Sequence, residues 1–358
     1  MNRRLRSLAA AVSGASALLL IPLGIATAGG EVPQQAATAP VVRPAPAGQT
    51  FSFALWGDMP YLRSGDGPKM AALVQDMNRA PIAFSVFDGD IKDGSSLCIE
   101  HHYAGAIERF NSLLAPVVYV PGDNEWTDCH RLNNGGYNNL ERLDYIRRTM
   151  FSTPNSFGQR RLALEHQGPL GGTYVENTRW VYGDVVFAGL NIPGSNNNKV
   201  NSPQECTANS IRTPADCAAD NDEYAARDAA NLDWLRQAFQ VAKSRNAAAV
   251  MLVIQADPGF DLPETDVNER DLPANDGYTN FLGVLAEETQ FFAGQVVLVH
   301  GDTHFFKLDK PLLDQAHLIE NFTRLETFGS PNVHWVKVDV NPRNPAVFTF
   351  TPMLVPGN

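Results

Sequence analysis

Four apolar segments of this chain are each followed, within two residues, by a glycine and then an aspartate. The pairs are Gly57-Asp58, Gly89-Asp90, Gly122-Asp123 and Gly301-Asp302. Each segment has the length and composition of a buried strand, and the carboxyl ends of strands in open α/β sheets are where ligands bind. One such aspartate is usually a turn or helix-cap residue. Four in the same position predict one carboxylate cluster, and carboxylates brought together need protons or a cation.

Strand and helix patterns alternate along the rest of the chain, which predicts an α/β fold. Helical spacing of apolar residues occurs in three segments, 69–78, 103–114 and 225–244. Strands are expected at 51–56, 82–87, 116–120, 185–190, 248–254, 296–299, 334–340 and 346–350. We therefore predict one domain over residues 51–358, with a polar surface insertion at about 191–222.

The first 28 residues have the pattern of a secretory signal peptide: three arginines, an apolar run and a small-residue cleavage site ending at Ala28. A permanent anchor is the alternative, but Gly14 and Pro22 dilute the apolar run. Residues 29–50 are rich in proline and alanine and are expected to form a linker. The prediction is an exported protein, periplasmic or secreted, with no stable membrane anchor after cleavage.

The formal net charge of −11 and the pI of about 5.2 disfavour two classes of partner. A protein that binds duplex nucleic acid usually has a basic face, and anionic membranes attract basic segments. Neither is expected here, and the oligomeric state is left unknown.

Four cysteines in a chain predicted to be exported favour disulfides. Of the three possible pairings we prefer Cys98–Cys129 and Cys206–Cys217, because each closes a short loop or ties two neighbouring loops. A thiolate metal site is less expected, since no Cys-x-x-Cys spacing is present.

In order and spacing, the four Gly-Asp blocks resemble the sequence blocks of the calcineurin-like metallophosphoesterase superfamily over about residues 51–310. The resemblance implies a two-layer β-sandwich flanked by helices, with two metal ions at the strand ends. It also implies hydrolysis of a small phosphate ester by a metal-bound hydroxide.

Several positions depart from the blocks of that superfamily. Pro60 stands where the first block has a histidine, and Asp123 and Asn124 replace an asparagine and a histidine. No histidine follows the strand that ends near Ile254, where only Gln255 and Asp257 offer oxygen ligands. The metal ligands implied by the resemblance are therefore Asp58, Asp90, Asp123, Gln255, Asp257, Asp302 and His304.

These replacements exchange imidazole for oxygen ligands, which favours Mn²⁺, Mg²⁺ or Ca²⁺ over Zn²⁺. The four aspartates balance the charge of two divalent ions, so the loaded site would attract an anion less than a histidine-rich site does. A further cation would offset this, and Lys92 is a candidate.

Two residues are candidates for the remaining chemistry. Asn124 occupies the position that the superfamily uses for phosphate contact or general acid catalysis. His130, six residues later and next to Cys129, is the candidate proton donor.

Two functions remain open. The first is an exported, metal-dependent phosphoesterase. The alternative is a catalytically weak or inactive protein of the same fold that binds metal ions or a partner, which the missing histidines favour. The enzyme is favoured because the candidate site positions are still occupied by polar residues.

Overall fold

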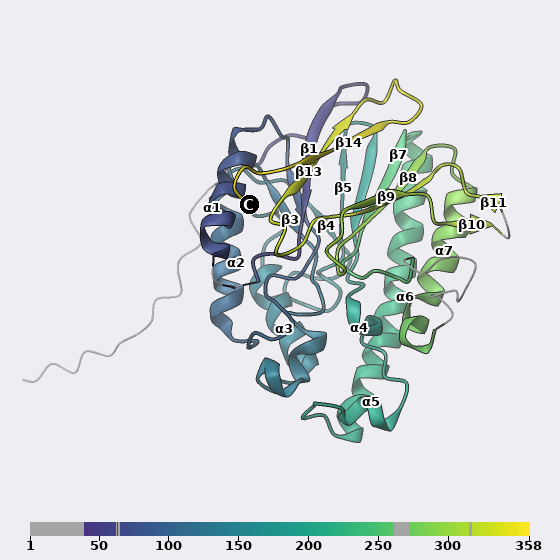
Figure 1. The fold of residues 1–358 in the computed structure, drawn as a ribbon. Helices are drawn as coiled ribbons and strands as arrows, with labels where there is room; N and C mark the ends of the chain where they lie inside the picture. Colours follow the sequence, from purple (N-terminus) through teal and green to yellow (C-terminus); the bar gives the residue numbers. More distant parts are fainter. Residues whose placement is uncertain (1–38, 62, 64, 261–271, 315–316) are drawn as a thin grey trace, which may run out of the picture. The chain divides into compact units, whose positions relative to one another are not determined.

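The fold was analysed in a computed structural model that describes residues 39–61, 63, 65–260, 272–314 and 317–358 (Figure 1). The predicted signal segment 1–28 lies outside the described residues. Residues 39–50, expected to be part of a linker, run along the domain in extended form. Three backbone hydrogen bonds join them to it: Val42 N donates to Arg161 O at 2.7 Å, Arg161 N to Pro40 O at 2.9 Å and Gly183 N to Ala45 O at 3.0 Å.

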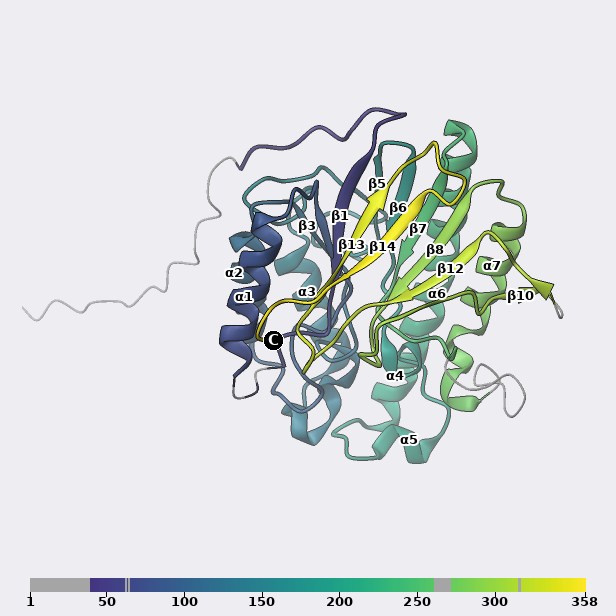
Figure 2. The ribbon, with the colours of Figure 1, turned by 45° about the horizontal axis from the view of Figure 1, so that its top comes forward.

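Two β-sheets form the centre of the domain (Figure 2). The first has five strands in the order β14-β13-β1-β2-β3. Its strands are β1 (Phe51–Trp56), β2 (Ser85–Phe87), β3 (Val117–Tyr119), β13 (Trp335–Val340) and β14 (Phe348–Met353). Strands β1, β2 and β3 are parallel, so their carboxyl ends reach the same edge.

The second sheet has seven strands in the order β4-β5-β6-β7-β8-β12-β9. Its strands are β4 (Glu165–His166), β5 (Thr178–Tyr182), β6 (Val185–Gly189), β7 (Ala249–Val253), β8 (Gln295–His300), β9 (Lys307–Asp309) and β12 (Phe322–Glu326). Strands β6, β7, β8 and β12 are parallel. A separate two-stranded ribbon consists of β10 (Leu313–Asp314) and β11 (His317–Leu318).

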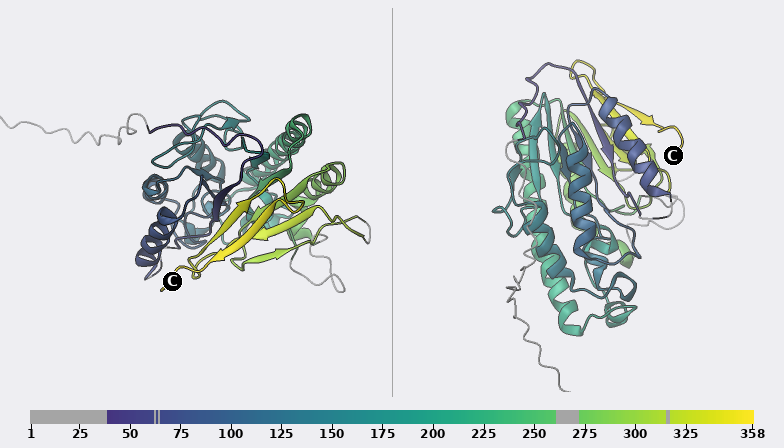
Figure 3. Two further views of the ribbon diagram at one scale, coloured as in Figure 1. Left: turned by 90° about the horizontal axis from the view of Figure 1, so that it is seen from above. Right: turned by 90° about the vertical axis from the view of Figure 1, so that its left-hand side faces the viewer.

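The sheets pack face to face, and helices cover the outer face of each (Figure 3). The helices are α1 (Asp66–Arg79), α2 (Glu100–Ser112), α3 (Asn139–Met150), α4 (Gly194–Asn197), α5 (Pro203–Thr207), α6 (Pro214–Arg245) and α7 (Thr279–Gln290). Helices α1, α2 and α3 contribute to the core beside the first sheet, and α6 and α7 to the core beside the second.

Strand alternation accounts for the buried layers. Phe53 and Leu55 of β1 face the second sheet, whereas Ala54 and Trp56 belong to the core under the helices. Both faces are therefore apolar, as expected for strands covered on both sides. The predicted α/β sandwich flanked by helices is confirmed.

Several predicted boundaries differ from those observed. Helix α6 begins at Pro214, inside the predicted insertion, because the Thr213 side chain and Asp216 form a capping box at its start. Strand β2 begins only at Ser85, three residues later than expected. Within the described residues, no helix is long and apolar enough to cross a bilayer.

Candidate metal centre

The four aspartates of the Gly-Asp pairs lie together where β1, β2, β3 and β8 end. The backbone N–H of Asp302 donates to both carboxylate oxygens of Asp58, at 3.2 Å each. The side-chain amide of Gln255 donates to Asp123 Oδ1 at 3.2 Å and to Asp302 Oδ1 at 3.4 Å. The Tyr61 hydroxyl connects Asp58 and Asp90. These contacts join carboxylates from both sheets into one cluster.

The glycines allow this convergence because side chains would not fit beside the carboxylates. A Cβ at Gly301 would collide with the Asp58 carboxylate, and one at Gly122 would collide with Asp90. The aspartates themselves adopt left-handed backbone angles, with φ of 49° at Asp58, 63° at Asp90 and 79° at Asp302. Such angles are uncommon for residues with a side chain and occur often at functional sites.

Tyr61 lies at the centre of the cluster, and the sequence analysis did not identify it. Its hydroxyl lies 3.1 Å from Asp90 Oδ2, 3.4 Å from Asp58 Oδ1 and 2.7 Å from His304 Nε2. The residue is 5% exposed. The only sequence signal for Tyr61 is its position close to Asp58, three residues further along the chain. It directly follows Pro60, the position at which the resemblance places a histidine.

The loop after β3 also holds the Asp90 carboxylate in place. Asn124 donates to Asp90 from its backbone at 3.2 Å and from its side-chain amide at 2.5 Å. Glu125 is fully buried and accepts hydrogen bonds from the backbone N–H groups of Asp90, Ile91 and Gly122. Glu125 therefore fixes the strand ends of β2 and β3 relative to each other.

His304 has the surroundings typical of a metal-binding histidine. Its Nδ1 lies 2.8 Å from the carbonyl oxygen of Ser330, which can only accept, so Nδ1 carries the proton. Its Nε2 faces the Tyr61 hydroxyl and lies 3.6 Å from Asp58 Oδ1. Metal-ligating histidines commonly donate their other N–H to a carbonyl in this way.

The two predicted ligands after β7 have different surroundings. Gln255 is fully buried, and its Oε1 accepts a bond from Gly194 N at 2.6 Å, which turns its amide N–H groups toward the aspartates. The Asp257 carboxylate accepts bonds from the backbone of Gly259 and Phe260. The Asp257 backbone N–H donates to Asp302 at 3.1 Å. In this structure, both residues hold neighbouring groups in place.

Asp257 also belongs to a second group of acidic and imidazole side chains. One ligand atom each of Asp257, His300 and Glu326 lies within 4.8 Å of the others. Lys307 Nζ lies 3.5 Å from Glu326, and Arg324 Nη1 lies 3.3 Å from His300 Nε2. Because these cations supply positive charge, this group has less need of a metal than the four-aspartate cluster.

The electrostatics of the cluster fit a bound cation. Burial raises the pKa of Asp58, Asp90 and Asp302 well above the usual aspartate range, and the neighbouring carboxylates raise each pKa further. In the described part of the chain, no lysine or arginine forms an ion pair with any of the four aspartates. The candidate cation Lys92 is buried and donates instead to Asp93 O and Asn134 Oδ1. Oxygen donors of this kind suit Mg²⁺, Ca²⁺ or Mn²⁺.

His130 lies near the cluster but outside it. Its Nδ1 contacts the Ser210 hydroxyl at 2.8 Å, and the side chain lines a cavity beside Asp123. Burial lowers its pKa to about 3, with Arg212 and Arg131 adding to the effect. The imidazole is therefore neutral at pH 7, and any proton that it donates must come from the neutral ring.

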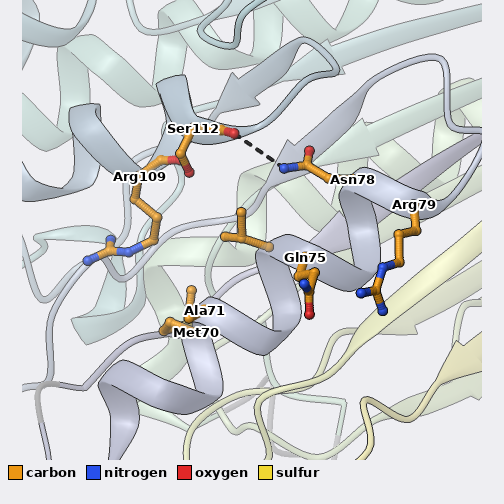
Figure 4. Close-up of a pocket in the computed structure, with 8 residues that line it drawn as sticks. Met70, Ala71, Gln75, Asn78, Arg79, Arg109 and Ser112 are labelled. Carbon is orange, nitrogen blue, oxygen red and sulfur yellow. Dashed lines mark hydrogen bonds between the residues drawn. The ribbon is translucent and has the colours of Figure 1, made fainter.

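Both preferred disulfides are present, and they secure the loops around the cluster. Cys98–Cys129 joins the start of α2 to the loop after β3, and Cys206–Cys217 joins α5 to α6. A further cavity between α1 and α2 includes Met70, Gln75 and Arg109 and shares no residue with the cluster (Figure 4).

No family model and no curated protein matches this sequence. Solved structures do match. The match to the structure of PhoD spans 89% of this chain and 69% of the PhoD chain, with 12% identity and a TM-score of 0.52. Purple acid phosphatase PPD1 from yellow lupin (Lupinus luteus) seeds covers 86% of this chain and 55% of its own, with 10% identity and a TM-score of 0.49. The match to a 5'-nucleotidase from Candida albicans spans 87% of this chain and 52% of the nucleotidase chain, with 12% identity and a TM-score of 0.42.

The architecture and the match to PhoD define the class of fold. The chain has the fold of the calcineurin-like metallophosphoesterases. The identities are low, so the likeness concerns the fold, and the chemistry has to be argued from the side chains described above.

Proposed function

We propose that this protein is an exported, metal-dependent phosphoesterase that acts on small phosphate esters. The observation that carries the proposal is the convergence of Asp58, Asp90, Asp123 and Asp302 with His304 at the strand ends of a metallophosphoesterase fold. Export is supported by the two disulfides and by the signal pattern in residues 1–28.

The residues that would hold the ions are the four aspartates and His304 Nε2. Asp90 would be the ligand that both ions share. Asn124 donates to both oxygens of its carboxylate, and the Tyr61 hydroxyl donates to Oδ2 as well. Two divalent ions, with Mn²⁺, Mg²⁺ or Ca²⁺ favoured over Zn²⁺, would supply Lewis-acid activation of water and of the phosphate when bound. The Gln255 amide would hold the Asp123 and Asp302 carboxylates in place relative to each other.

The Asn124 amide and the Tyr61 hydroxyl, which both contact Asp90, are the polar groups that we propose orient the ester beside it. Asn124 Nδ2 lies 3.4 Å from the Tyr61 oxygen, so the two donors form one edge of the site. His130 stays a candidate proton donor for the leaving group, acting from the neutral ring.

The test is turnover of an aryl phosphate monoester and an aryl phosphate diester by the purified mature protein. Each assay contains Mn²⁺, Mg²⁺, Ca²⁺ or a chelator. We expect at least one of the ions to support turnover. EDTA should abolish this turnover, and Asp90→Asn should eliminate it.

The second candidate is a protein of this fold that binds ions or a partner without catalysis. Four carboxylates offset the charge of two divalent ions, which weakens the attraction for an anionic ester. Ions that raise the melting temperature without supporting turnover would favour this candidate over the enzyme.

A further inference from the structure

A cavity of about 660 Å³ lies beside Asp123, between the loop after β3 and the segment 195–212. Its first wall contains Asp128, His130 and Arg131, and its second contains Ser195, Lys199 and Arg212. The two walls are bonded to each other, with Ile211 N donating to His130 O and Leu132 N donating to Asn209 O. Backbone hydrogen bonds therefore hold the two walls of the cavity together.

Ser195 separates this cavity from the carboxylate cluster. Its hydroxyl lies 3.0 Å from Asp123 Oδ2 and 2.6 Å from Asp128 Oδ1. Arg131 Nη2 donates to the Ser195 hydroxyl at 3.1 Å, and Arg131 Nη1 pairs with Asp128. The Arg131 side chain is 36% exposed, so N–H groups that these contacts do not use can reach a ligand. A group in the cavity would lie next to a phosphate held at the cluster.

The backbone that carries Ser195 is held in an uncommon conformation. Residues 195–198 all have left-handed φ angles, between 52° and 63°. Asn197 secures the turn, because its side chain accepts from Arg227 and its N–H donates to the Tyr278 hydroxyl. Such a conformation costs free energy and persists only where the surroundings impose it, which is common at ligand sites.

The lining selects among possible leaving groups. None of the described residues that line the cavity is a phenylalanine, tyrosine or tryptophan, and the one aromatic ring among them, that of His130, is held by the Ser210 hydroxyl, so the lining offers little surface on which a nucleobase or an aryl ring could stack. Its lining instead offers the guanidinium of Arg131, the ammonium of Lys199, which also pairs with Asp276 at 2.6 Å, and the hydroxyl of Ser202, which also caps α5. These donors match a leaving group with several hydroxyls.

We propose that this cavity binds the polyhydroxylated leaving group of a phosphate monoester, such as a sugar phosphate, and that Arg131 determines this specificity. The inference rests on the proposed function, since it names the substrate class of the same site. Arg131 acts on selectivity by contacting the leaving group, while bond cleavage takes place at the carboxylate cluster.

The experiment compares kcat/KM for glucose 6-phosphate with kcat/KM for p-nitrophenyl phosphate, in the mature protein with Mn²⁺. Arg131→Met is expected to lower the ratio of the two values about tenfold, because one charged hydrogen-bond partner is lost. Arg131→Lys should restore part of the ratio. The matched control is Arg236→Met, which removes an exposed arginine of α6 and should leave the ratio unchanged.

The outcomes separate the inference from the proposed function. Turnover of both esters with an unchanged ratio in Arg131→Met would overturn the inference alone. If neither ester is turned over, the proposed function fails, and binding of glucose 6-phosphate to the Mn²⁺-loaded protein is measured by calorimetry. Binding that Arg131→Met weakens about tenfold would then support the cavity assignment, and binding that is absent or unaffected would overturn it.

Discussion

The backbone N–H of Asp302 donates to the Asp58 carboxylate although 244 residues separate the two. Asp58 follows β1 of the first sheet and Asp302 follows β8 of the second. The bond therefore joins the carboxyl edges of both sheets at the point where the acidic side chains gather. Anything that separates these two residues should dismantle the proposed metal centre.

Removing one carboxylate should stabilise the ion-free protein while it weakens ion binding. Asp302→Asn relieves repulsion in a cluster where burial and neighbouring carboxylates raise the pKa of Asp302. We expect a gain of about 1 kcal/mol in the free energy of unfolding without metal. The rise in melting temperature on addition of Mn²⁺ should be lost. Asp314→Asn, at an exposed position in β10, is the control and should change neither value.

Adding a methyl group at Gly301 should displace Asp58. A Cβ there would overlap the Asp58 carboxylate, so Gly301→Ala is expected to cost about 1–3 kcal/mol of stability and to weaken Mn²⁺ binding. Gly283→Ala in α7 is the matched control, because nothing lies within 4 Å of its Cβ position. The control should gain about 0.5–1 kcal/mol from helix propensity. Equal effects of the two substitutions in denaturant melts would argue against the proposed geometry.

Tyr61 is expected to tune the centre through its hydroxyl. Tyr61→Phe removes the oxygen that contacts Asp58, Asp90 and His304 but keeps the buried ring. Loss of such a partner typically costs about 10–100-fold in metal affinity or activity. Tyr137→Phe is the control on a tyrosine outside the cluster. Wild-type Mn²⁺ affinity and turnover in Tyr61→Phe would exclude a role for the hydroxyl.

His130 should make the fold more sensitive to acid. Its pKa falls from the ordinary 6.5 to about 3 in the folded protein, so the unfolded chain binds the extra proton between these values. The contribution of His130 to stability is therefore lost as the pH falls from 6.5 toward 3. Replacement by glutamine should flatten the pH dependence of the unfolding free energy in that window. His317→Gln, at an exposed position, should leave the wild-type slope.

The elements that the sequence predicted best are those with local signals. The apolar runs before Asp58, Asp90 and Asp123 are strands, because period and composition decide strand formation locally. The two disulfides follow the preferred pairing, since both bridges close short separations of 31 and 11 residues. The sandwich class was predicted from the resemblance.

The features of the site that the sequence did not predict depend on contacts between residues far apart in the chain. Tyr61 reaches the cluster because the left-handed turn at Asp58 redirects the chain, and no periodicity reveals such a turn. His130 contacts Ser210, 80 residues away, so its surroundings depend on where the insertion folds. Gln255 was predicted as an oxygen ligand, but Gly194 N occupies its oxygen in the structure. Whether Gln255 or Asp257 binds an ion stays a prediction.

The most direct test of the account is a calorimetric titration of the purified, metal-free mature protein with Mn²⁺, repeated with Asp90→Asn. The account predicts saturable uptake of about two ions per chain, as two-metal sites require, and its loss in the variant. A flat titration of the wild-type protein, or uptake that Asp90→Asn leaves unchanged, would contradict the claim that these carboxylates form a metal centre.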